Sequence, residues 1–436
     1  MKNPTSPRLR RARVFVAMSG GVDSSVAAAL LKERGFDVIG CHIKCYNLDG
    51  CGEKDADDAR RVAEQLNISF YVFDLEQEYK DRVVNYMINE YRAGRTPNPD
   101  VMCNKEIKFG LFLQRALQLG ADYVATGHYV RLSKSGGADL PSGSRIVLLQ
   151  RQNFLLPRPA GLTSFGPSPA GLRDVPSDKS APPAHRLFQA RDKNKDQSYF
   201  LWTLTQEQLK RCLFPIGEYT KPEVRQLAKK FGLITADKKD SQGICFLGRV
   251  TLADFLKSYI PEKRGVVLAA TGEKVGEHGG AHLYTIGQRR GLGLGGLSAP
   301  AYVAEKDMAA NALIVAEGEN NPALYQKEIK LRDVNFINPK LEIVRPRRIR
   351  LWRKNCLPAI GLGLRHWQAG KLEILARVRY RQPLAPATLK MFYTPNSNEY
   401  VQKLIFEKPQ KFIAPGQSAV FYSREGELLG GGIIIR

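Results

Sequence analysis

Apolar and polar positions follow two different spacings in the first part of the chain. The apolar runs at 13–18, 36–43 and 69–75 are short and bounded by polar residues, which predicts buried strands. Segments with apolar residues three and four positions apart follow these runs and predict helices, the longest over 76–94. Strands that alternate with helices predict an α/β fold, in which a doubly wound parallel sheet binds its ligands at the carboxyl ends of the strands.

The segment 95–104 interrupts this alternation. Its sequence, RTPNPDVMCN, holds two prolines and predicts a loop. A further helix over 105–120 and a strand over 121–130 are expected after it, so the sheet continues.

The rest of the chain changes character twice. Seven of the 25 prolines lie between Phe154 and Pro183, which predicts an insertion over about 134–183. Residues 241–296 are rich in glycine, and from Ala301 onward many short strands with turn signals predict a small barrel or sandwich. We therefore expect three domains, at 1–240, 241–298 and 299–436.

The charge of the chain narrows the class of partner. It holds 66 Lys and Arg against 43 Asp and Glu, a formal net charge of +23, which favours a polyanion such as a nucleic acid. Basic residues crowd 345–354 around a tryptophan. Arginines alternate along 377–381 (RVRYR), so in a strand they would project from one face, with Tyr380 on the other. Basic residues interleaved with aromatic ones suit single-stranded RNA, and a solvated basic face is the alternative.

Two features bear on the compartment. Seven cysteines are a sparse and odd count for a secreted disulfide scaffold, so a special cysteine is expected to be catalytic or metal-bound in a reducing compartment. No apolar run approaches the ~18 residues of a membrane span, and no apolar stretch of signal-peptide length precedes the first strand. We expect a cytoplasmic protein without membrane contact.

A glycine- and serine-rich segment lies between the first predicted strand and helix. SGGVDSS (Ser19–Ser25) places Gly20 and Gly21 where a backbone must approach an anion closely, beside hydroxyls and the amides of a helix N-terminus. Asp23 would hold Mg²⁺ or orient the loop. No lysine follows the glycines, so the segment is not a Walker A loop, and the alternative is an ordinary capped Gly-Gly turn.

Two cysteines lie in segments typical of chemistry. Cys103 follows a double-proline turn just before a predicted helix, whose N-terminus would lower the pKa of the thiol. Cys245 lies in a glycine-containing loop, KKDSQGICFLG. For either cysteine alone, the alternative is a buried small apolar side chain. In a chain with a nucleotide loop, a catalytic role for both cysteines is favoured, because an adenylated oxygen needs a nucleophile to displace it.

Longer motifs carry a resemblance to known families. SGGVDSS resembles the loop of the PP-loop ATP pyrophosphatases, which use ATP to attach AMP to a substrate oxygen. From Val14 to near the C-terminus, apart from 134–183 and 346–368, the sequence is similar to the tRNA-specific 2-thiouridylase family in SGGVDSS, TPNPDVMCNKEIKFG, ATGHYVR, DKNKDQSYFLW, PIGEYTKPEVR, KKDSQGICFLG, GEHGGAHLYTIGQRRGLGLGG and PGQSAVFY. The resemblance implies a PP-loop catalytic domain (adenine nucleotide alpha hydrolase-like), a small central β-rich domain and a C-terminal β-barrel.

The resemblance also implies a tRNA-uridine 2-sulfurtransferase, which replaces O2 of the wobble uridine (U34) with sulfur. ATP would adenylate that oxygen, which then leaves as AMP. Cys245 would carry the sulfur as a persulfide, whose terminal sulfur attacks C2 directly or is released as hydrosulfide for the attack. Cys103 would resolve the persulfide through a Cys103–Cys245 disulfide, and Asp100 is a candidate acid or base. An iron–sulfur cluster on these three residues is possible, but we do not favour it. Two competing functions stay open: a PP-loop ligase for a small metabolite, such as an argininosuccinate synthase-like enzyme, and a non-catalytic RNA-binding or sulfur-relay protein.

Further site residues carry over from the family one position at a time. Those assigned to ATP are Ala17, Met18, Ser19, Gly20, Gly21, Val22, Asp23, Ser24, Ile43 and Gly127. Those assigned to tRNA are Asn98, Pro99, Asp100, His128, Lys195, Asp196, Gln197, Arg379, Tyr380 and Gln417. Mg²⁺ is expected with ATP, and a cysteine desulfurase or relay protein is expected to donate sulfur to a monomeric enzyme.

Three further patterns resemble binding motifs, but the sequence around each favours an ordinary structural explanation. GLGLGG (291–296) matches a dinucleotide fingerprint but lacks the strand and helix that should flank it. His278 and His282 have the spacing of a helical zinc pair, which the two glycines between them oppose. A metal site on the cysteines near the nucleotide sheet lacks an obvious fourth ligand; these are Cys41, Cys45 and Cys51.

Overall fold

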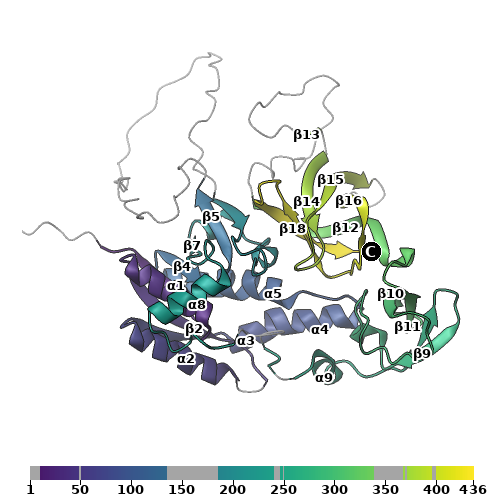
Figure 1. Ribbon diagram of the computed structural model, residues 1–436, viewed down its shortest axis with the longest axis horizontal. Coiled ribbons are helices and arrows are strands. Elements are labelled where there is room, and N and C mark those ends of the chain that lie inside the picture. Colours follow the sequence, from purple (N-terminus) through teal and green to yellow (C-terminus); the bar gives the residue numbers. More distant parts are fainter. Residues whose placement is uncertain are drawn as a thin grey trace, which may run out of the picture.

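The computed structural model describes residues 10–48, 51–134, 185–239, 246–248, 250–337, 367–368, 371–394 and 399–436. Within them the chain forms an α/β part, a small central sheet and a C-terminal barrel (Figure 1). The predicted fold class is therefore confirmed. Most of the expected insertion over 134–183, and the whole basic segment 345–354, lie outside the described residues.

A parallel sheet of five strands forms the first part. Its strands are β1 (Arg13–Ala17), β2 (Asp37–Lys44), β3 (Ser69–Asp74), β4 (Tyr123–Thr126) and β7 (Cys212–Leu213). Their order is β3-β2-β1-β4-β7, and every pairing is parallel. Side chains alternate across β1, so that Val14 and Val16 belong to one core and Phe15 to another.

Helices cover both faces of this sheet. One face carries α1 (Val22–Glu33), α2 (Cys51–Gln65) and α8 (Lys221–Lys230), whose apolar residues pack with Val14 and Val16. The Phe15 face carries two helical runs. The first is α3 (Glu76–Tyr79), η1 (Lys80–Val84) and α4 (Asn85–Arg92); the second is α5 (Pro99–Met102), η2 (Cys103–Phe112) and α6 (Leu113–Gln118).

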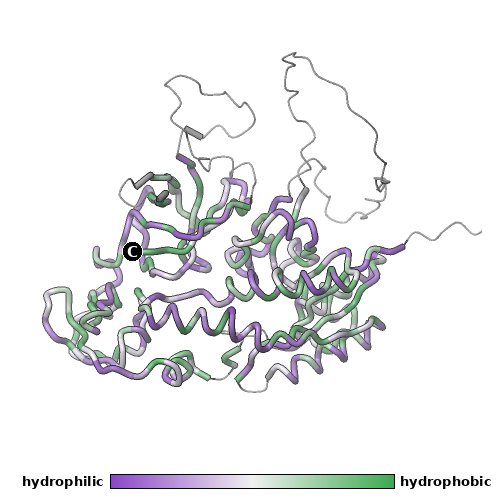
Figure 2. The backbone as a smooth tube through the Cα atoms, turned by 180° about the vertical axis from the view of Figure 1, so that it is seen from behind, coloured by the Kyte–Doolittle hydropathy of each residue, from purple (hydrophilic) through white to green (hydrophobic). Residues whose placement is uncertain are grey.

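Hydropathy follows the layers. In Figure 2 the tube alternates between hydrophilic and hydrophobic colours along the helices, as expected for helices with one buried face. No helix in the described part of the chain is long and apolar enough to cross a membrane. The first part is completed by β5 (Val130–Lys134), β6 (His185–Gln189), η3 (Ser198–Phe200) and α7 (Gln206–Leu209).

A four-stranded sheet forms the central part. It is made of β8 (Gly265–Ala269), β9 (Lys274–His278), β10 (Ala301–Asp307) and β11 (Ala312–Glu317), with α9 (Leu252–Lys257) before it and η4 (Ala281–Leu283) after β9. Since β11 pairs in parallel with β8, the sheet runs on to residue 317, past the boundary expected at 298. Such a long-range pairing leaves no trace in the local pattern.

The C-terminal part is a closed barrel, not a sandwich. Its strands are β12 (Tyr325–Phe336), β14 (Lys371–Arg377), β15 (Ala385–Thr394), β16 (Glu399–Lys411), β17 (Ser418–Tyr422) and β18 (Leu428–Ile435), with η5 (Pro322–Leu324) before them and β13 (Trp367–Gln368) beside β14. The pairing of β14 with β17 closes the ring. Closure leaves no open sheet edge between these two strands.

The alternation expected along 377–381 is wrong. β14 ends at Arg377, the backbone N–H of Val378 donates to Oε1 of Gln382, and Arg381 has a left-handed φ of 64°. The chain therefore turns where the strand was expected to continue. Arg377 is buried and Arg381 is exposed, so the arginines do not form one basic face.

Candidate active site

The nucleotide loop connects β1 to α1, as predicted. Gly20 has a φ of +72°, and Gly21 is the N-cap of α1 without a side-chain cap. Hydroxyls hold the turn: Ser24 Oγ accepts from the Ser19 backbone N–H at 3.1 Å, and Ser25 Oγ donates to the Gly21 carbonyl at 2.8 Å. Because no side chain caps α1, the loop keeps the helix N-terminus available for an anion. Ile43 is half-buried near the end of the neighbouring strand β2.

Gly127 is required by the close approach of two segments. It follows β4, and a Cβ at this position would lie 2.6 Å from the Ser24 backbone nitrogen and 2.7 Å from the Asp23 carbonyl carbon. Both of these atoms are backbone, which has little freedom to move. The glycine therefore lets the segment after β4 press directly against the nucleotide loop.

We expect Gly127→Ala to weaken ATP binding by at least about tenfold and to destabilise the fold by ~1–3 kcal/mol, because the added methyl group displaces the first turn of α1. Calorimetric titration with ATP and urea unfolding would measure the two effects. Gly295→Ala is the matched control, since a Cβ there meets nothing within 4 Å. Wild-type ATP affinity in the Gly127 variant would contradict the assignment.

Asp23 is tied to two distant residues. Its carboxylate accepts a hydrogen bond of 2.8 Å from the Tyr129 hydroxyl, and Lys221 Nζ lies 2.8 and 2.9 Å from its two oxygens. Lys221 is 8% exposed and opens α8, where a proline and a capping box fix the helix start. Of the two roles expected for Asp23, this arrangement matches orientation of the loop. A lysine does reach the nucleotide loop, but from 198 positions further along the chain.

Replacing Lys221 by methionine should weaken ATP binding by about tenfold or more, because the Asp23 carboxylate would then stay unneutralised in an anion-binding loop (a charged hydrogen bond contributes ~1.5–3 kcal/mol). The affinity for adenosine, which has no phosphate, should hardly change. Lys230→Met, at the exposed end of the same helix, is the control. An equal loss for ATP and adenosine would indicate a folding defect instead.

The segment before Cys103 is helical earlier than predicted. Asn98 caps α5, its side chain accepting from the Val101 backbone N–H at 3.3 Å, and Pro99 occupies the first turn. Cys103 therefore continues a helix that begins at Pro99, and it does not lie at a helix N-terminus. The helix N-terminus that was expected directly before Cys103 lies instead at Pro99, one turn earlier.

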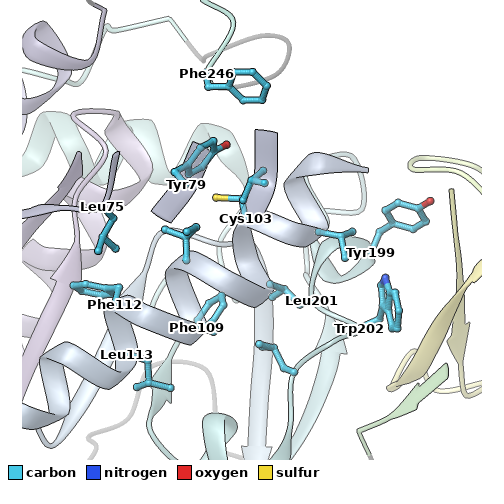
Figure 3. Close-up of a cluster of buried hydrophobic side chains, with 14 of the residues drawn as sticks. Leu75, Tyr79, Cys103, Phe109, Phe112, Leu113, Tyr199, Leu201, Trp202 and Phe246 are labelled. Carbon is cyan, nitrogen blue, oxygen red and sulfur yellow. The ribbon is translucent and has the colours of Figure 1, made fainter. Parts of the chain in front are cut away.

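Cys103 lies in an aromatic and aliphatic cluster. Its side chain is 8% exposed, and Figure 3 shows it beside Tyr79, with Phe246 beyond. Asn104, the next residue, is also buried and donates to the Phe200 carbonyl at 3.4 Å. Asp100, one turn earlier, is half-buried, and burial raises its pKa although the charge of Lys108 opposes the shift. A carboxyl group with a raised pKa suits proton transfer near neutral pH.

Cys245 itself lies outside the described residues. The next residue, Phe246, belongs to the same buried cluster as Cys103. Its ring centroid lies 5.8 Å from that of Tyr79, and its carbonyl accepts from the Leu48 backbone N–H at 3.4 Å. The chain directly after Cys245 thus reaches the core that encloses Cys103.

His128 is placed inside the protein. It is 7% exposed, its Nδ1 lies 2.8 Å from Thr126 Oγ1, and its ring packs against Phe109 and Phe214. Burial, with a smaller contribution from Lys108, lowers its pKa well below the ordinary value, so the ring is neutral. This is the environment of a core histidine, and the assignment of His128 to tRNA stays a prediction.

Residues 195–197 lie at the junction with the barrel. Asp196 is buried and accepts hydrogen bonds from the backbone and side chain of Ser198. It also accepts one of 2.7 Å from Arg377 on β14, and the two side chains are 1% and 6% exposed. Gln197 exchanges hydrogen bonds with the Tyr129 backbone, and Lys195 is half-buried. Asp196 therefore joins two parts of the fold, and it faces no solvent.

The barrel residues assigned to tRNA also make contacts between parts of the fold. Arg379 donates to the Ile286 carbonyl of the central part, and burial lowers the pKa of its guanidinium. Tyr380 packs on Phe200 with ring centroids 4.6 Å apart. Gln417 donates to carbonyls of the segment that leads into α5.

Sequence reasoning missed two sets of residues. Lys221 lies in the motif PIGEYTKPEVR, next to a proline that opens a helix. The motif was noticed, but nothing in the sequence indicated that this lysine pairs with Asp23. The buried Glu90, which pairs with Arg95 and with Arg332 of the barrel, gave no local signal.

Among the described residues, no group of three or more His, Cys, Asp and Glu side chains could hold a metal. The sites considered on Cys51 and on Cys245 are not tested, because the Cys51 side chain and the whole of Cys245 lie outside the described residues. His278 and His282 are both buried, and His278 Nδ1 accepts from the Gly280 backbone N–H at 3.0 Å. Cys41 is enclosed in β2, where burial raises its pKa. GLGLGG forms turns in which Gly291, Gly293 and Gly296 have positive φ.

Three family models match the chain in sequence order. They are the tRNA methyl transferase HUP domain over 12–153 and 177–249, the tRNA methyl transferase PRC-barrel domain over 253–317, and the aminomethyltransferase beta-barrel domain over 363–434.

Curated relatives match along almost the whole chain. A tRNA-specific 2-thiouridylase MnmA 1 of Geobacillus kaustophilus is 41% identical over 98% of this chain and 96% of its own. Proteins named tRNA-specific 2-thiouridylase MnmA from Bacillus pumilus and Streptococcus mutans are each 40% identical over 97% of this chain, and over 94% and 95% of their own.

Proposed function

The chain belongs to the family of tRNA-specific 2-thiouridylases, and we propose that it uses ATP to replace O2 of the wobble uridine (U34) of tRNA with sulfur. The net charge of +23 supports a tRNA substrate, because Lys and Arg release counterions from phosphates. The family's use of ATP fits the uncapped helix N-terminus at Ser19–Ser25.

One observation carries the proposal. Two successive residues after β4 connect the nucleotide loop to the helix of Cys103: Gly127 presses on the Ser24 backbone, and His128 packs on Phe109 of η2. The helical segment that carries the Cys103 thiol thus packs against residues that adjoin the nucleotide loop. This neighbourhood supports adenylation followed by attack of sulfur.

The proposed chemistry has two stages. The uracil O2 attacks the α-phosphate of ATP, and pyrophosphate leaves. The terminal sulfur of a Cys245 persulfide then attacks C2, and AMP leaves with the original oxygen. The Cys103 thiolate attacks the Cys245 sulfur, which frees 2-thiouridine and leaves a Cys103–Cys245 disulfide that an external dithiol must reduce.

The remaining assigned residues keep proposed roles. Asp100 is the candidate proton donor or acceptor, with Asn98 and Pro99 next to the target base, and flipping a base out of a single-stranded loop costs little. The other residues assigned to tRNA would contact it or, where they are buried, hold the residues that do. They are His128, Lys195, Asp196, Gln197, Arg379, Tyr380 and Gln417.

A resident magnesium site does not fit the described residues, because the Asp23 carboxylate is already engaged by Lys221 and Tyr129. We propose that Mg²⁺ enters with the phosphates of ATP. A cysteine desulfurase or relay protein would donate the sulfur to a monomeric, cytoplasmic enzyme. We assign catalysis to 1–240, the second cysteine to the following central part, and tRNA binding to the C-terminal barrel.

Incubation with ATP, a persulfide donor and unmodified tRNA, followed by nucleoside analysis, tests the function. We expect 2-thiouridine and one AMP for each sulfur transferred. AMP formation on a small acceptor without tRNA would favour the small-metabolite ligase. Binding of tRNA with no turnover would favour the non-catalytic RNA-binding protein.

A further inference from the structure

The C-terminal barrel holds the segment that leads into the Cys103 helix. The Thr96 backbone N–H donates to the Pro415 carbonyl at 2.8 Å. Gln417 Nε2 donates to the Thr96 carbonyl at 2.9 Å and to the Pro97 carbonyl at 3.0 Å. Both N–H groups of one amide are therefore used on successive carbonyls, directly before Asn98.

The fit between the two segments is close. Gly416, between these barrel residues, has a φ of +93°, and a Cβ there would lie 2.8 Å from the Thr96 carbonyl oxygen. Thr96 Oγ1 also donates to Thr285 Oγ1 of the central part at 3.2 Å. Thr96, which is 8% exposed, is thus held by both the barrel and the central part.

An ion-pair network fixes the residue before Thr96. Arg95 donates to both oxygens of Glu90 at 2.7 Å, and Arg332 of β12 lies 3.1 and 3.2 Å from the same oxygens. The Glu90 side chain is 7% exposed, whereas the arginines are 36% and 39% exposed. Burial alone would raise the pKa of Glu90, but the hydrogen bond from Arg95 and the two positive charges lower it, so the network is charged at neutral pH.

We propose that Gln417 is a positioning residue for the Asn98–Cys103 segment, and that the barrel acts on the reaction through it. The proposal rests on the proposed function and changes the role that the family resemblance gives to Gln417. The two donors of its amide are bound to Thr96 and Pro97 and cannot also donate to RNA, which leaves the carbonyl oxygen as the polar atom for such a contact. Its removal frees the segment that is to face the target base.

The test separates holding the segment from touching tRNA. In Gln417→Ala the single-turnover rate of thiolation at saturating tRNA should fall about 10- to 100-fold, because a displacement of about 1 Å at a reacting centre has that effect. The dissociation constant for tRNA should stay within about twofold. Gln410→Ala is the control, since within the described part of the chain that side chain forms its hydrogen bonds inside the barrel. Persulfide loading of Cys245 should be unaffected.

A second variant gives the same readout without removing a polar group. Gly416→Ala adds a methyl group against the Thr96 carbonyl, and it should lower the saturated single-turnover rate in the same way. A wild-type rate at saturating tRNA for both variants, with weaker tRNA binding for Gln417→Ala, would overturn the proposal and restore a direct contact. If the wild-type protein forms no 2-thiouridine, the proposed function itself fails, and the two failures are distinct.

Discussion

Cys245→Ser is expected to abolish 2-thiouridine formation with a persulfide donor, by at least about 10³-fold, because a serine hydroxyl cannot carry the transferable sulfur. Release of pyrophosphate from ATP in the presence of tRNA should fall less, since adenylation precedes the attack of sulfur, whereas AMP should stay on the tRNA. Nucleoside analysis of the tRNA measures the first effect. Mass spectrometry of the proteolytic peptide that contains residue 245 shows whether the protein still carries a persulfide there.

The buried cysteines of the same core supply the matched variants. Cys103→Ala should keep the persulfide on Cys245 and lose multiple turnover, because the adduct is no longer resolved. Cys212→Ala should keep both the persulfide on Cys245 and multiple turnover. Cys212 is buried in the same cluster as Cys103, but it lies on β7 and has no assigned role in the reaction. Normal turnover in Cys245→Ser, or an equal defect in Cys212→Ala, would refute the assignment of the two thiols.

Asp196→Asn should lower the free energy of unfolding by about 3–5 kcal/mol, the largest stability effect that we expect. The amide leaves the guanidinium of Arg377 without a counter-charge at a site where that arginine is 6% exposed. The buried charge then cannot recover its hydration. Urea unfolding, monitored by tryptophan fluorescence, measures the change.

An exposed aspartate provides the comparison. Asp57 pairs with Arg60 on α2, with side chains that are 62% and 56% exposed, so Asp57→Asn should cost less than ~0.5 kcal/mol. If Asp196→Asn is as stable as the wild-type protein and only binds tRNA more weakly, the carboxylate contacts tRNA and does not stabilise the contact between the first part of the fold and the barrel.

Features encoded by neighbouring residues were accessible from the sequence. The loop at Ser19–Ser25 could be predicted, because its glycines, its hydroxyls and the start of the helix are contiguous in the sequence. A strand pattern precedes the loop and a helix pattern follows it, as an α/β fold requires. Four strands of the parallel sheet followed from the same alternation, whereas the two-residue strand β7 was not expected. Gly127 was assigned to the nucleotide through resemblance alone, and its close approach to Ser24 gives the physical reason for a glycine there.

Pairings across long stretches of chain were not accessible. Lys221 reaches Asp23 over 198 positions, and Arg377 reaches Asp196 over 181. Neither basic residue shows in its local pattern that it will be buried with a carboxylate. The strand expected over 377–381 failed for the same reason, because inward burial of Arg377 and the turn after it depend on the closed barrel.

The order in which the polypeptide is synthesised gives the contacts at Pro415 and Gln417 a consequence. A ribosome-bound chain completes its ATP loop once Lys221 has emerged, but Thr96 acquires its amide partner only with Gln417, which follows it by 321 positions. Nascent chains that end before the barrel would hold nucleotide without a fixed segment ahead of Cys103. With Gln417 as the positioning residue, sulfur chemistry is expected to begin only after the barrel strands have been translated.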